Sequence, residues 1–295
     1  MKRPTDDDTA DALSAVTLTV RGRYLRVPDV GSWERKAAPK SKPLEVSAMG
    51  FVADNADEWA AVRINRGRMS VQAARDRALL MTTDTMYSEL LQEAATLTLR
   101  APLPEHLDPG YLAENLFCSG TATAKTLCVG DVLAVTKAHK RRRGATDEGG
   151  GLVLQVASPC QPCHKVDERL GKTKNGGGVR AHAARTGLRG WFVRVLTPGT
   201  LREGDAFAVV ERPNPAWPLS RVADLIYNID GVCDGPQYVW PTTGADVAAK
   251  FRGTQEELRE LASLPELADF EWGEEAKKML VAWEAAERKK ACAIL

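Results

Sequence analysis

Two cysteines in the segment SPCQPCHKVDERLG, residues 158–171, are the residues best suited to chemistry. Cys160 and Cys163 lie three positions apart, each preceded by a proline, and His164 and Lys165 follow at once. A thiolate is a nucleophile and a soft metal ligand, so the spacing is compatible with a metal site, a redox pair or one activated thiol. Two buried structural cysteines without chemistry are a fourth interpretation.

A structural zinc site needs about four nitrogen or sulfur ligands, commonly as two separated pairs. The chain has one Cys-x-x-Cys pair; Cys118 and Cys128 are too far apart to form a second, although His164 and His182 are further possible ligands. A thioredoxin-like pair would lie where a strand leads into a helix, whereas this pair leads into a polar loop. Neither interpretation is favoured by the sequence.

An activated thiolate at Cys163 is favoured by its neighbours. His164, Lys165 and Arg169 bring positive charge close in sequence, which lowers the pKa of a thiol. The proline before each cysteine restricts the backbone of the loop. The residues alone leave the other three interpretations open.

Most of the segments around this loop are predicted to be strands. Period-two alternation of apolar and polar residues, typical of half-buried strands, occurs at residues 17–20, 43–51, 96–100, 131–136, 151–157, 190–197 and 205–210. Helical patterns interrupt them at 70–81 and 83–94. Short strands separated by glycine and proline predict a mainly β protein whose sheet closes into a barrel.

The pattern changes after the proline-rich segment 211–218, from a period of two to a period of 3.6. Three helices are expected here. The first has an apolar stripe of Leu219, Val222 and Ile226, and the second begins at a Thr254–Glu257 capping box. The third has an apolar face formed by Ala276, Met279, Leu280 and Trp283. We therefore predict a tail at 1–14, a β-barrel domain at 15–213, a helical appendage at 214–291 and a terminal tetrapeptide at 292–295.

Composition excludes several classes of protein. The 295 residues are 44% hydrophobic and 27% charged, which is typical of a soluble globular chain. Lys plus Arg number 40 against 39 for Asp plus Glu, so the net charge of +1 gives no global field for nucleic acid. No apolar run approaches the ~20 residues that span a bilayer. Six cysteines without a secretory signal lead us to expect reduced thiols and a cytoplasmic location.

Three segments together resemble the MOSC domain, the molybdenum cofactor sulfurase C-terminal family, in its bacterial YiiM branch. They are 112–135 with Glu-Asn-Leu and Val-Gly-Asp, 151–166 with the strand into Pro-Cys-x-Lys, and 186–213 with Gly-Trp and Pro-Gly. The helical tail is similar to the three-helix appendage of that branch. The resemblance covers residues 14–285.

The resemblance implies a MOSC-type β-barrel with flanking helices. It also implies that Cys163 ligates molybdenum or carries sulfur, while Cys160 takes a position that is commonly not cysteine. The related mitochondrial amidoxime reducing component uses its molybdenum cofactor to reduce N-hydroxylated compounds, so the same reaction on a small molecule is implied here. Pyridoxal phosphate binding is a further property associated with the family. Since the sequence has no flavin, haem or iron–sulfur pattern, the electrons would come from a separate donor.

The molybdenum cofactor carries an anionic phosphate, so its pocket needs cationic side chains and backbone donors. The candidate cations are Arg75, Arg77, Lys165 and Arg189. Asn115 of the Glu-Asn-Leu motif is expected to hydrogen-bond the cofactor or to hold a turn, and Glu114 to orient the loop.

The chain departs from the YiiM pattern at one motif. Where that pattern has His-Gly-Gly-Pro-Asp-Arg-Ala-Leu, residues 72–79 are Gln-Ala-Ala-Arg-Asp-Arg-Ala-Leu. The histidine and both glycines are absent. The alternative function is therefore a non-catalytic sulfur-carrier or cofactor-delivery module.

The sequence ends in Cys292-Ala293-Ile294-Leu295, a C-a-a-X box that would direct geranylgeranylation of Cys292 in a eukaryotic cell. One lipid anchors weakly, and the basic residues 288–290 add a small electrostatic contribution. We expect at most reversible membrane association from this motif.

Overall fold

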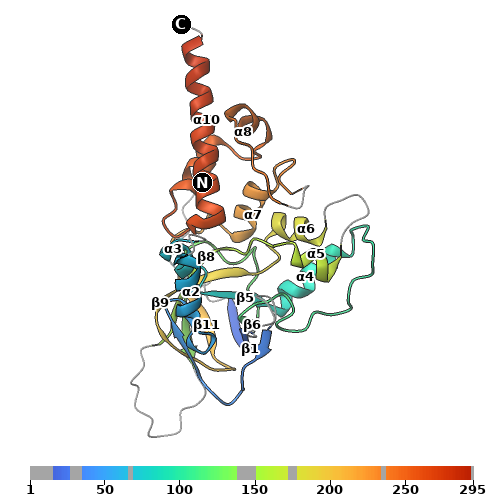
Figure 1. The fold of residues 1–295 in the computed structure, drawn as a ribbon, viewed down its shortest axis with the longest axis vertical. Helices are drawn as coiled ribbons and strands as arrows, with labels where there is room; N and C mark the ends of the chain where they lie inside the picture. The colour runs from blue at the N-terminus through green and yellow to red at the C-terminus, as the bar shows by residue number, and fades with distance from the viewer. Residues whose placement is uncertain are drawn as a thin grey trace, which may run out of the picture.

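The computed structural model describes residues 16–26, 35–65, 69–137, 151–171, 178–233 and 237–293. The predicted tail at 1–14 and the last two residues of the C-a-a-X box lie outside these ranges. Figure 1 shows a β-barrel at one end of the molecule and a helical appendage at the other, with the long helix α10 extending away from the barrel.

Seven strands form a closed barrel in the order β11-β7-β8-β9-β5-β6-β1, and β1 pairs back to β11. They are β1 (Thr17–Arg26), β5 (Leu79–Thr83), β6 (Leu116–Ser119), β7 (Val132–Lys137), β8 (Val153–Pro159), β9 (Trp191–Thr197) and β11 (Ala206–Glu211). The pairings are antiparallel except for the parallel pair β5–β6. The predicted barrel is confirmed.

Short elements surround the barrel. The strand β2 (Arg35–Ala37) pairs antiparallel with the end of β1. A small separate sheet is formed by β3 (Leu44–Ser47), β4 (Gly50–Phe51) and β10 (Gly199–Leu201). The flanking helices are the 3-10 turn η1 (Val52–Asp54), α2 (Ala56–Asn65), α3 (Val71–Asp76), α4 (Asp84–Ala94), α5 (Lys165–Leu170) and α6 (Val179–Thr186).

The appendage follows β11. It consists of α7 (Leu219–Tyr227), α8 (Gly244–Lys250), α9 (Gln255–Ser263), the irregular π-type turn η2 (Asp269–Gly273) and α10 (Glu274–Ala293). The predicted stripe on α7 is buried, and the predicted Thr254–Glu257 capping box begins α9. Within the described residues, every helix is too short or too polar to cross a lipid bilayer.

Two predicted elements are wrong. The helix expected at 70–81 ends at Asp76, and Leu79–Thr83 is instead β5, fully buried between β6 and β9. A continuous apolar run does not distinguish a buried strand from a helix. The strand expected at 96–100 is a turn, because the amides of Thr96 and Leu97 donate to carbonyls at the end of α4.

Glycine is required where β9 begins. Gly190 has a φ of +103°, and a Cβ atom there would lie 2.3 Å from the carbonyl oxygen of Met81 in β5. Its own carbonyl accepts a 2.8 Å hydrogen bond from the amide of Cys160. The Gly-Trp motif thus allows β5, β9 and the cysteine segment to approach one another closely.

Candidate functional site

The segment 160–164, which we call the thiol loop, connects β8 to α5. Cys160 is buried, and burial raises the pKa of its thiol, an effect opposed by the nearby Arg189 and Arg77 guanidiniums. Cys163 is half-buried. A helix that the sequence did not predict begins two residues after Cys163, so the loop lies between a strand and a helix. Because Cys160 is buried and Cys163 is only half-buried, the thiol of Cys163 is the more accessible to solvent and ligands.

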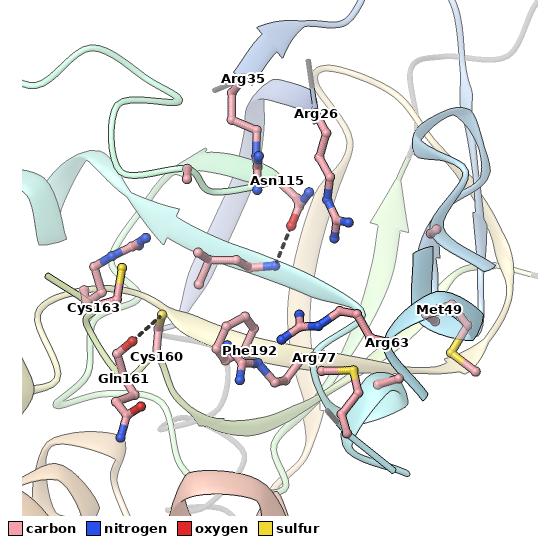
Figure 2. Close-up of a pocket in the computed structure, with 17 residues that line it drawn as sticks. Arg26, Arg35, Met49, Arg63, Arg77, Asn115, Cys160, Gln161, Cys163 and Phe192 are labelled. Carbon is pink, nitrogen blue, oxygen red and sulfur yellow. Dashed lines mark hydrogen bonds between the residues drawn. The ribbon is translucent and has the colours of Figure 1, made fainter. Parts of the chain in front are cut away.

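Cys163 lies on the wall of a cavity of about 190 Å³ at one end of the barrel. Figure 2 shows arginines from separate elements converging on this space, opposite the two cysteines. Five arginines line it, and none of its described lining residues is Asp or Glu: the arginines are Arg26, Arg35, Arg63, Arg77 and Arg189. We call it the arginine cavity.

The five guanidiniums come from five places in the chain. Arg26 ends β1, Arg35 begins β2, Arg63 lies in the last turn of α2, Arg77 caps the end of α3, and Arg189 precedes β9. Barrel closure brings these elements to the same opening. The charge of the cavity is thus a product of the tertiary structure.

The electrostatics of the cavity favour an anion. Burial and the neighbouring Arg26 lower the pKa of Arg35 to about 10. Burial also lowers the pKa of Arg26, although Asp54 acts in the opposite direction. Guanidiniums that are partly desolvated and repel one another are stabilised when an anion binds between them.

Arg77 joins the cavity to the appendage. Its guanidinium lies 3.2 Å from a carboxylate oxygen of Glu271 and stacks over the ring of Phe192 at 4.4 Å. Glu271 has a left-handed backbone, with a φ of 71°, which a non-glycine residue adopts only under constraint. The ion pair therefore fixes an irregular point of η2 against the barrel.

The Glu-Asn-Leu motif builds the wall opposite the thiols. Glu114 is buried and accepts hydrogen bonds from the Tyr87 hydroxyl at 2.7 Å and the Gly110 amide at 2.5 Å, as expected for a residue that orients the loop. Asn115 accepts a 3.0 Å hydrogen bond from the Leu80 amide through its side-chain oxygen. Its amide nitrogen makes no hydrogen bond with the described residues, so a donor remains at the cavity wall.

Arg189 also positions this wall, because its guanidinium donates to the carbonyl of Leu112. The next residue, Ala113, lines the cavity and has a φ of 67°. A left-handed alanine is costly and is retained only where neighbouring contacts determine it. Arg189 and Glu114 supply those contacts.

Four of the six residues predicted to bind metal or cofactor line the arginine cavity, namely Cys163, Arg77, Asn115 and Arg189. Arg75 is exposed on α3 and lies outside the cavity. Lys165 also lies outside it and forms a 2.9 Å ion pair with Glu168 on α5. Cys292, the predicted lipidation site, is exposed in the last turn of α10.

The cations that follow Cys163 in sequence are directed elsewhere. His164 lies 3.6 Å from Glu168, the same carboxylate that pairs with Lys165, and Arg169 donates to the carbonyl of Tyr111. The positive charge beside the thiol loop comes instead from Arg77 and Arg189.

Sequence reasoning missed Arg26, Arg35 and Arg63. They belong to no motif, and their neighbours in sequence do not distinguish them from surface arginines. The only local signal is that Arg26 ends a long alternating segment beginning at Thr17. Their convergence follows from the β1–β2 pairing and the placement of α2, which no local pattern specifies.

The altered motif at 72–79 affects the cavity less than expected. Gln72 stands where the YiiM pattern has histidine; it lies outside the arginine cavity and donates a 2.7 Å hydrogen bond to Asp76. Ala74 stands at a glycine position and lines the cavity. The substitution at 74 therefore adds one methyl group to the wall.

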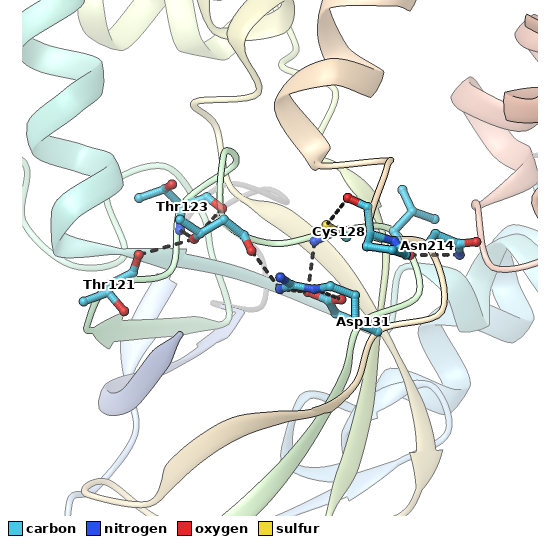
Figure 3. Close-up of polar contacts among 9 residues, drawn as sticks. Thr121, Thr123, Cys128, Asp131 and Asn214 are labelled. Atoms are coloured by element: carbon cyan, nitrogen blue, oxygen red, sulfur yellow. Dashed lines mark hydrogen bonds and ion pairs between the residues drawn. The ribbon is translucent and has the colours of Figure 1, made fainter. Parts of the chain in front are cut away.

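The Val-Gly-Asp motif has a structural role. Asp131 is fully buried and accepts hydrogen bonds of 2.8 and 2.7 Å from Arg212 and 2.9 Å from the Cys128 amide. Asn214 donates to the carbonyl of Val129 at 3.0 Å, and Figure 3 shows these contacts joining the start of β7 to the chain that follows β11. The network anchors the connection between the barrel and the appendage.

Two tyrosines of the appendage hold the thiol loop. The Tyr238 hydroxyl donates to the Pro162 carbonyl, and the side-chain amide of Gln161 donates to the Tyr227 hydroxyl. The two rings meet edge to face, with centroids 4.9 Å apart. Both residues immediately before Cys163 are thus bound to the appendage.

The described protein side chains around Cys160 and Cys163 do not form a metal site by themselves. In the described parts of the chain, no group of three or more His, Cys, Asp or Glu side chains could hold a metal ion. Among these residues, a metal at Cys163 would therefore have fewer than three such protein ligands.

Comparison with known proteins agrees with the architecture. Residues 66–208 match the MOSC domain family. A protein named "Reductase" from Gibberella moniliformis (strain M3125 / FGSC 7600) is 29% identical over 125 residues, which are 42% of this chain and 19% of that protein. The chain thus spans about a fifth of the length of this relative. Arg26, Arg35 and Arg63 precede the family match.

Solved structures extend the likeness to nearly the whole chain. YiiM from Geobacillus stearothermophilus is 16% identical, with a TM-score of 0.51, over 90% of this chain and 98% of that one. YiiM from Escherichia coli is 15% identical, with a TM-score of 0.52, over 90% and 92%. At these identities the likeness concerns the fold. Residues 66–208 of the chain therefore match a MOSC domain, and its overall fold is that of the YiiM proteins.

Proposed function

We propose that this protein is a molybdenum-cofactor-dependent oxidoreductase that reduces N-hydroxylated small molecules, with Cys163 as the molybdenum ligand. The observation that carries the proposal is the half-buried thiol of Cys163 on the wall of a cavity lined by five arginines and by no described carboxylate. A soft sulfur ligand beside a strongly cationic hollow suits an anionic metal cofactor.

The donor set fits the parts of that cofactor. Arg26 and Arg35 are suited to its phosphate, because an anion would offset the burial and the repulsion from Arg26 that lower the pKa of Arg35. The amide nitrogen of Asn115 and the guanidinium of Arg189 are suited to polar edges of the pterin. Arg75 and Lys165 have no place in this proposal, because both lie outside the cavity.

When bound, the cofactor supplies a two-electron redox centre. In the proposed reduction the N–O bond breaks, two electrons and two protons are taken up, and the hydroxyl leaves as water. A separate electron-donor protein provides the electrons. The reductase name of the relative from Gibberella moniliformis supports an oxidoreductase, and the N-hydroxylated substrate is part of the proposal.

Metal content tests the ligand assignment. The protein is purified from a host that makes the cofactor, and molybdenum and pterin are measured in wild type, Cys163→Ala and Cys160→Ala. Cys160 is the matched control, since its buried thiol lies in the same loop. Wild type and Cys160→Ala should contain molybdenum, and Cys163→Ala should lack it. Equal metal in all three would refute the assignment.

Turnover tests the reaction. Reduction of benzamidoxime with a chemically reduced viologen dye should depend on both the cofactor and Cys163. A cofactor-loaded protein that carries persulfide on Cys163 and does not reduce the substrate would instead support the sulfur-carrier alternative.

A further inference from the structure

Both cysteines of the thiol loop line the arginine cavity. Figure 2 shows Cys160 and Cys163 on the same side of this space. Cys160 packs with Leu80 and Phe192 in a small cluster separate from the main core, and both of these neighbours also line the cavity. The side chain of Cys160 therefore lies at the edge of the cavity and outside the main core.

The two thiols differ in exposure in a way that suits two successive roles. Cys160 is 5% exposed, whereas Cys163 is half-buried. A small oxidant dissolved in the cavity therefore meets Cys163 first. An accessible thiol beside a second, shielded thiol is the arrangement in which the first sulfur is oxidised and the second resolves it as a disulfide.

The backbone of the thiol loop is held at both ends. The amide of Cys160 donates a 2.8 Å hydrogen bond to the carbonyl of Gly190, and the carbonyl of Cys163 accepts one of 3.0 Å from the amide of Val166. The two residues between the cysteines are bound to the appendage. The loop follows a strand and leads into a helix, the setting of Cys-x-x-Cys redox pairs, which the sequence did not predict. A loop held in this way keeps the second thiol beside the first, so the entropy lost when they join is small.

The charge of the cavity favours an oxidation that produces an anion. Arg77 and Arg189 lie near the sulfur of Cys160 and line the same wall. When a peroxide bond breaks, the leaving oxygen carries negative charge, which guanidinium groups stabilise. The arginine cavity therefore provides both the access and the electrostatic environment for this step.

We infer that Cys160 and Cys163 form a reversible disulfide when a small hydroperoxide oxidises the cofactor-free protein, with Cys160 as the resolving thiol. With hydrogen peroxide, the Cys163 sulfur attacks one oxygen, the O–O bond breaks, and a sulfenic acid and water form. The Cys160 sulfur then attacks the Cys163 sulfur, the S–O bond breaks, and the hydroxyl leaves as water with the proton of Cys160. The two electrons lost by the thiols reduce the peroxide, and a dithiol reductant restores both thiols by exchange.

The disulfide withdraws Cys163 from metal binding, because the thiolate is the form that ligates a metal. It also protects Cys163 before the cofactor arrives, since a disulfide is reversible whereas sulfonic acid is not. The effect on the metal rests on the proposed function, but formation of the disulfide does not.

Peptide mapping of the full-length, cofactor-free protein in a Cys292→Ala background tests the disulfide. Trypsin releases both cysteines in one peptide, residues 144–165. After treatment with hydrogen peroxide and blocking by N-ethylmaleimide in denaturant, this peptide should lack two hydrogen atoms and carry no maleimide. Dithiothreitol given before blocking should restore a maleimide on each cysteine. Cys128→Ala, which removes a buried cysteine outside the loop, is the matched control and should give the same result.

Trapping with dimedone, which reacts with sulfenic acids, tests the order of the two steps. In Cys160→Ala the dimedone adduct should accumulate on Cys163, whereas the parent protein should form the disulfide and little adduct. Equal adduct with and without Cys160 would overturn the inference. So would oxidation of Cys163 in the parent protein without the loss of two hydrogen atoms from the peptide, a result that needs no substitution in the loop.

Molybdenum uptake separates this inference from the proposed function. Peroxide given before the cofactor should abolish molybdenum uptake by the parent protein, and dithiothreitol should restore it. Formation of the disulfide in a protein that never takes up molybdenum would refute the proposed function alone. Conversely, Cys163-dependent molybdenum without the disulfide would overturn the present inference alone.

Discussion

The hydroxyl of Tyr238 donates a 2.5 Å hydrogen bond to the backbone carbonyl of Pro162, the residue that precedes Cys163. A side chain of the appendage thereby fixes the backbone of a loop that belongs to the barrel. Proline has no amide hydrogen, so its carbonyl is the only backbone group through which this position can be held by a hydrogen bond. The position of the thiol thus depends on an element outside the barrel.

Tyr238→Phe removes this bond and keeps the ring. We expect the free energy of unfolding to fall by about 1 kcal/mol, the usual net contribution of one hydrogen bond. In a Cys292→Ala background, the thiol of Cys163 should react faster with a disulfide reagent, because the loop is released. Stopped-flow thiol kinetics and urea denaturation measure the two effects.

Tyr111→Phe is the matched control. It also removes a tyrosine hydroxyl bound to a carbonyl, that of Arg169, at 3.0 Å. It should reduce stability by a similar amount and leave the reaction rate of Cys163 unchanged. If both variants accelerated the thiol equally, general loosening rather than the Pro162 contact would be responsible.

Arg35→Met tests the electrostatics of the arginine cavity. Without multivalent anions we expect this variant to be at least as stable as wild type, because burial and the neighbouring Arg26 disfavour the charge of the guanidinium that it removes. Pyrophosphate should raise the melting temperature of wild type and raise that of Arg35→Met much less. Arg75→Met, which changes an exposed arginine outside the cavity, should match wild type in both conditions; an identical response to pyrophosphate in all three proteins would contradict the anion site.

Asp131→Asn should be strongly destabilising. It leaves the Arg212 guanidinium, most of which is buried, without its carboxylate, and breaking a buried pair from one side reduces stability by about 3 kcal/mol. Asp246→Asn removes the exposed charge beside Lys250 but keeps an oxygen that can accept from the Thr243 hydroxyl, so it should change stability by less than about 0.5 kcal/mol. Chemical denaturation measures the free energy of unfolding of both variants. Equal, small losses in the two variants would contradict a structural role for Asp131.

Stability should decrease at alkaline pH because of buried thiols. Burial raises the pKa of Cys118 from 9.0 to about 12, so the folded protein keeps this proton after the unfolded chain has lost it. Ionisation then stabilises only the unfolded state, and stability falls as the pH rises above 9. Cys118→Ala lacks this effect, so its destabilisation relative to wild type should shrink by about 2 kcal/mol between pH 8 and pH 10.5. Cys292→Ala, which changes an exposed thiol, is the control for the loss of a cysteine.

The fold could be predicted where apolar and polar residues alternate along a strand. The alternating segments that became β7, β8, β9 and β11 have the period expected of such strands, and the prediction is confirmed. The prediction failed for Leu79–Thr83, where both faces are buried and alternation disappears. It also failed for Leu97 and Leu99, which alternate because they pack on the core from a turn.

The candidate site could be predicted where its residues belong to motifs. Cys163, Asn115 and Arg189 lie in or beside recognisable segments, whereas Arg26, Arg35 and Arg63 do not. Nearness in sequence was a poor guide to charge, since Lys165 follows Cys163 within two residues and pairs with Glu168 instead. Electrostatic environment is set by tertiary placement, and local sequence does not encode it.

The seam between β1 and β11 joins Thr17 to Ala208, residues at opposite ends of the barrel sequence. During synthesis, β1 can find this neighbour only after almost the whole barrel has left the ribosome. Until then the nascent sheet has two unpaired edges, which are prone to association with other chains. The last step of barrel assembly therefore pairs both edges at once, and we expect this long-range closure to make folding slow.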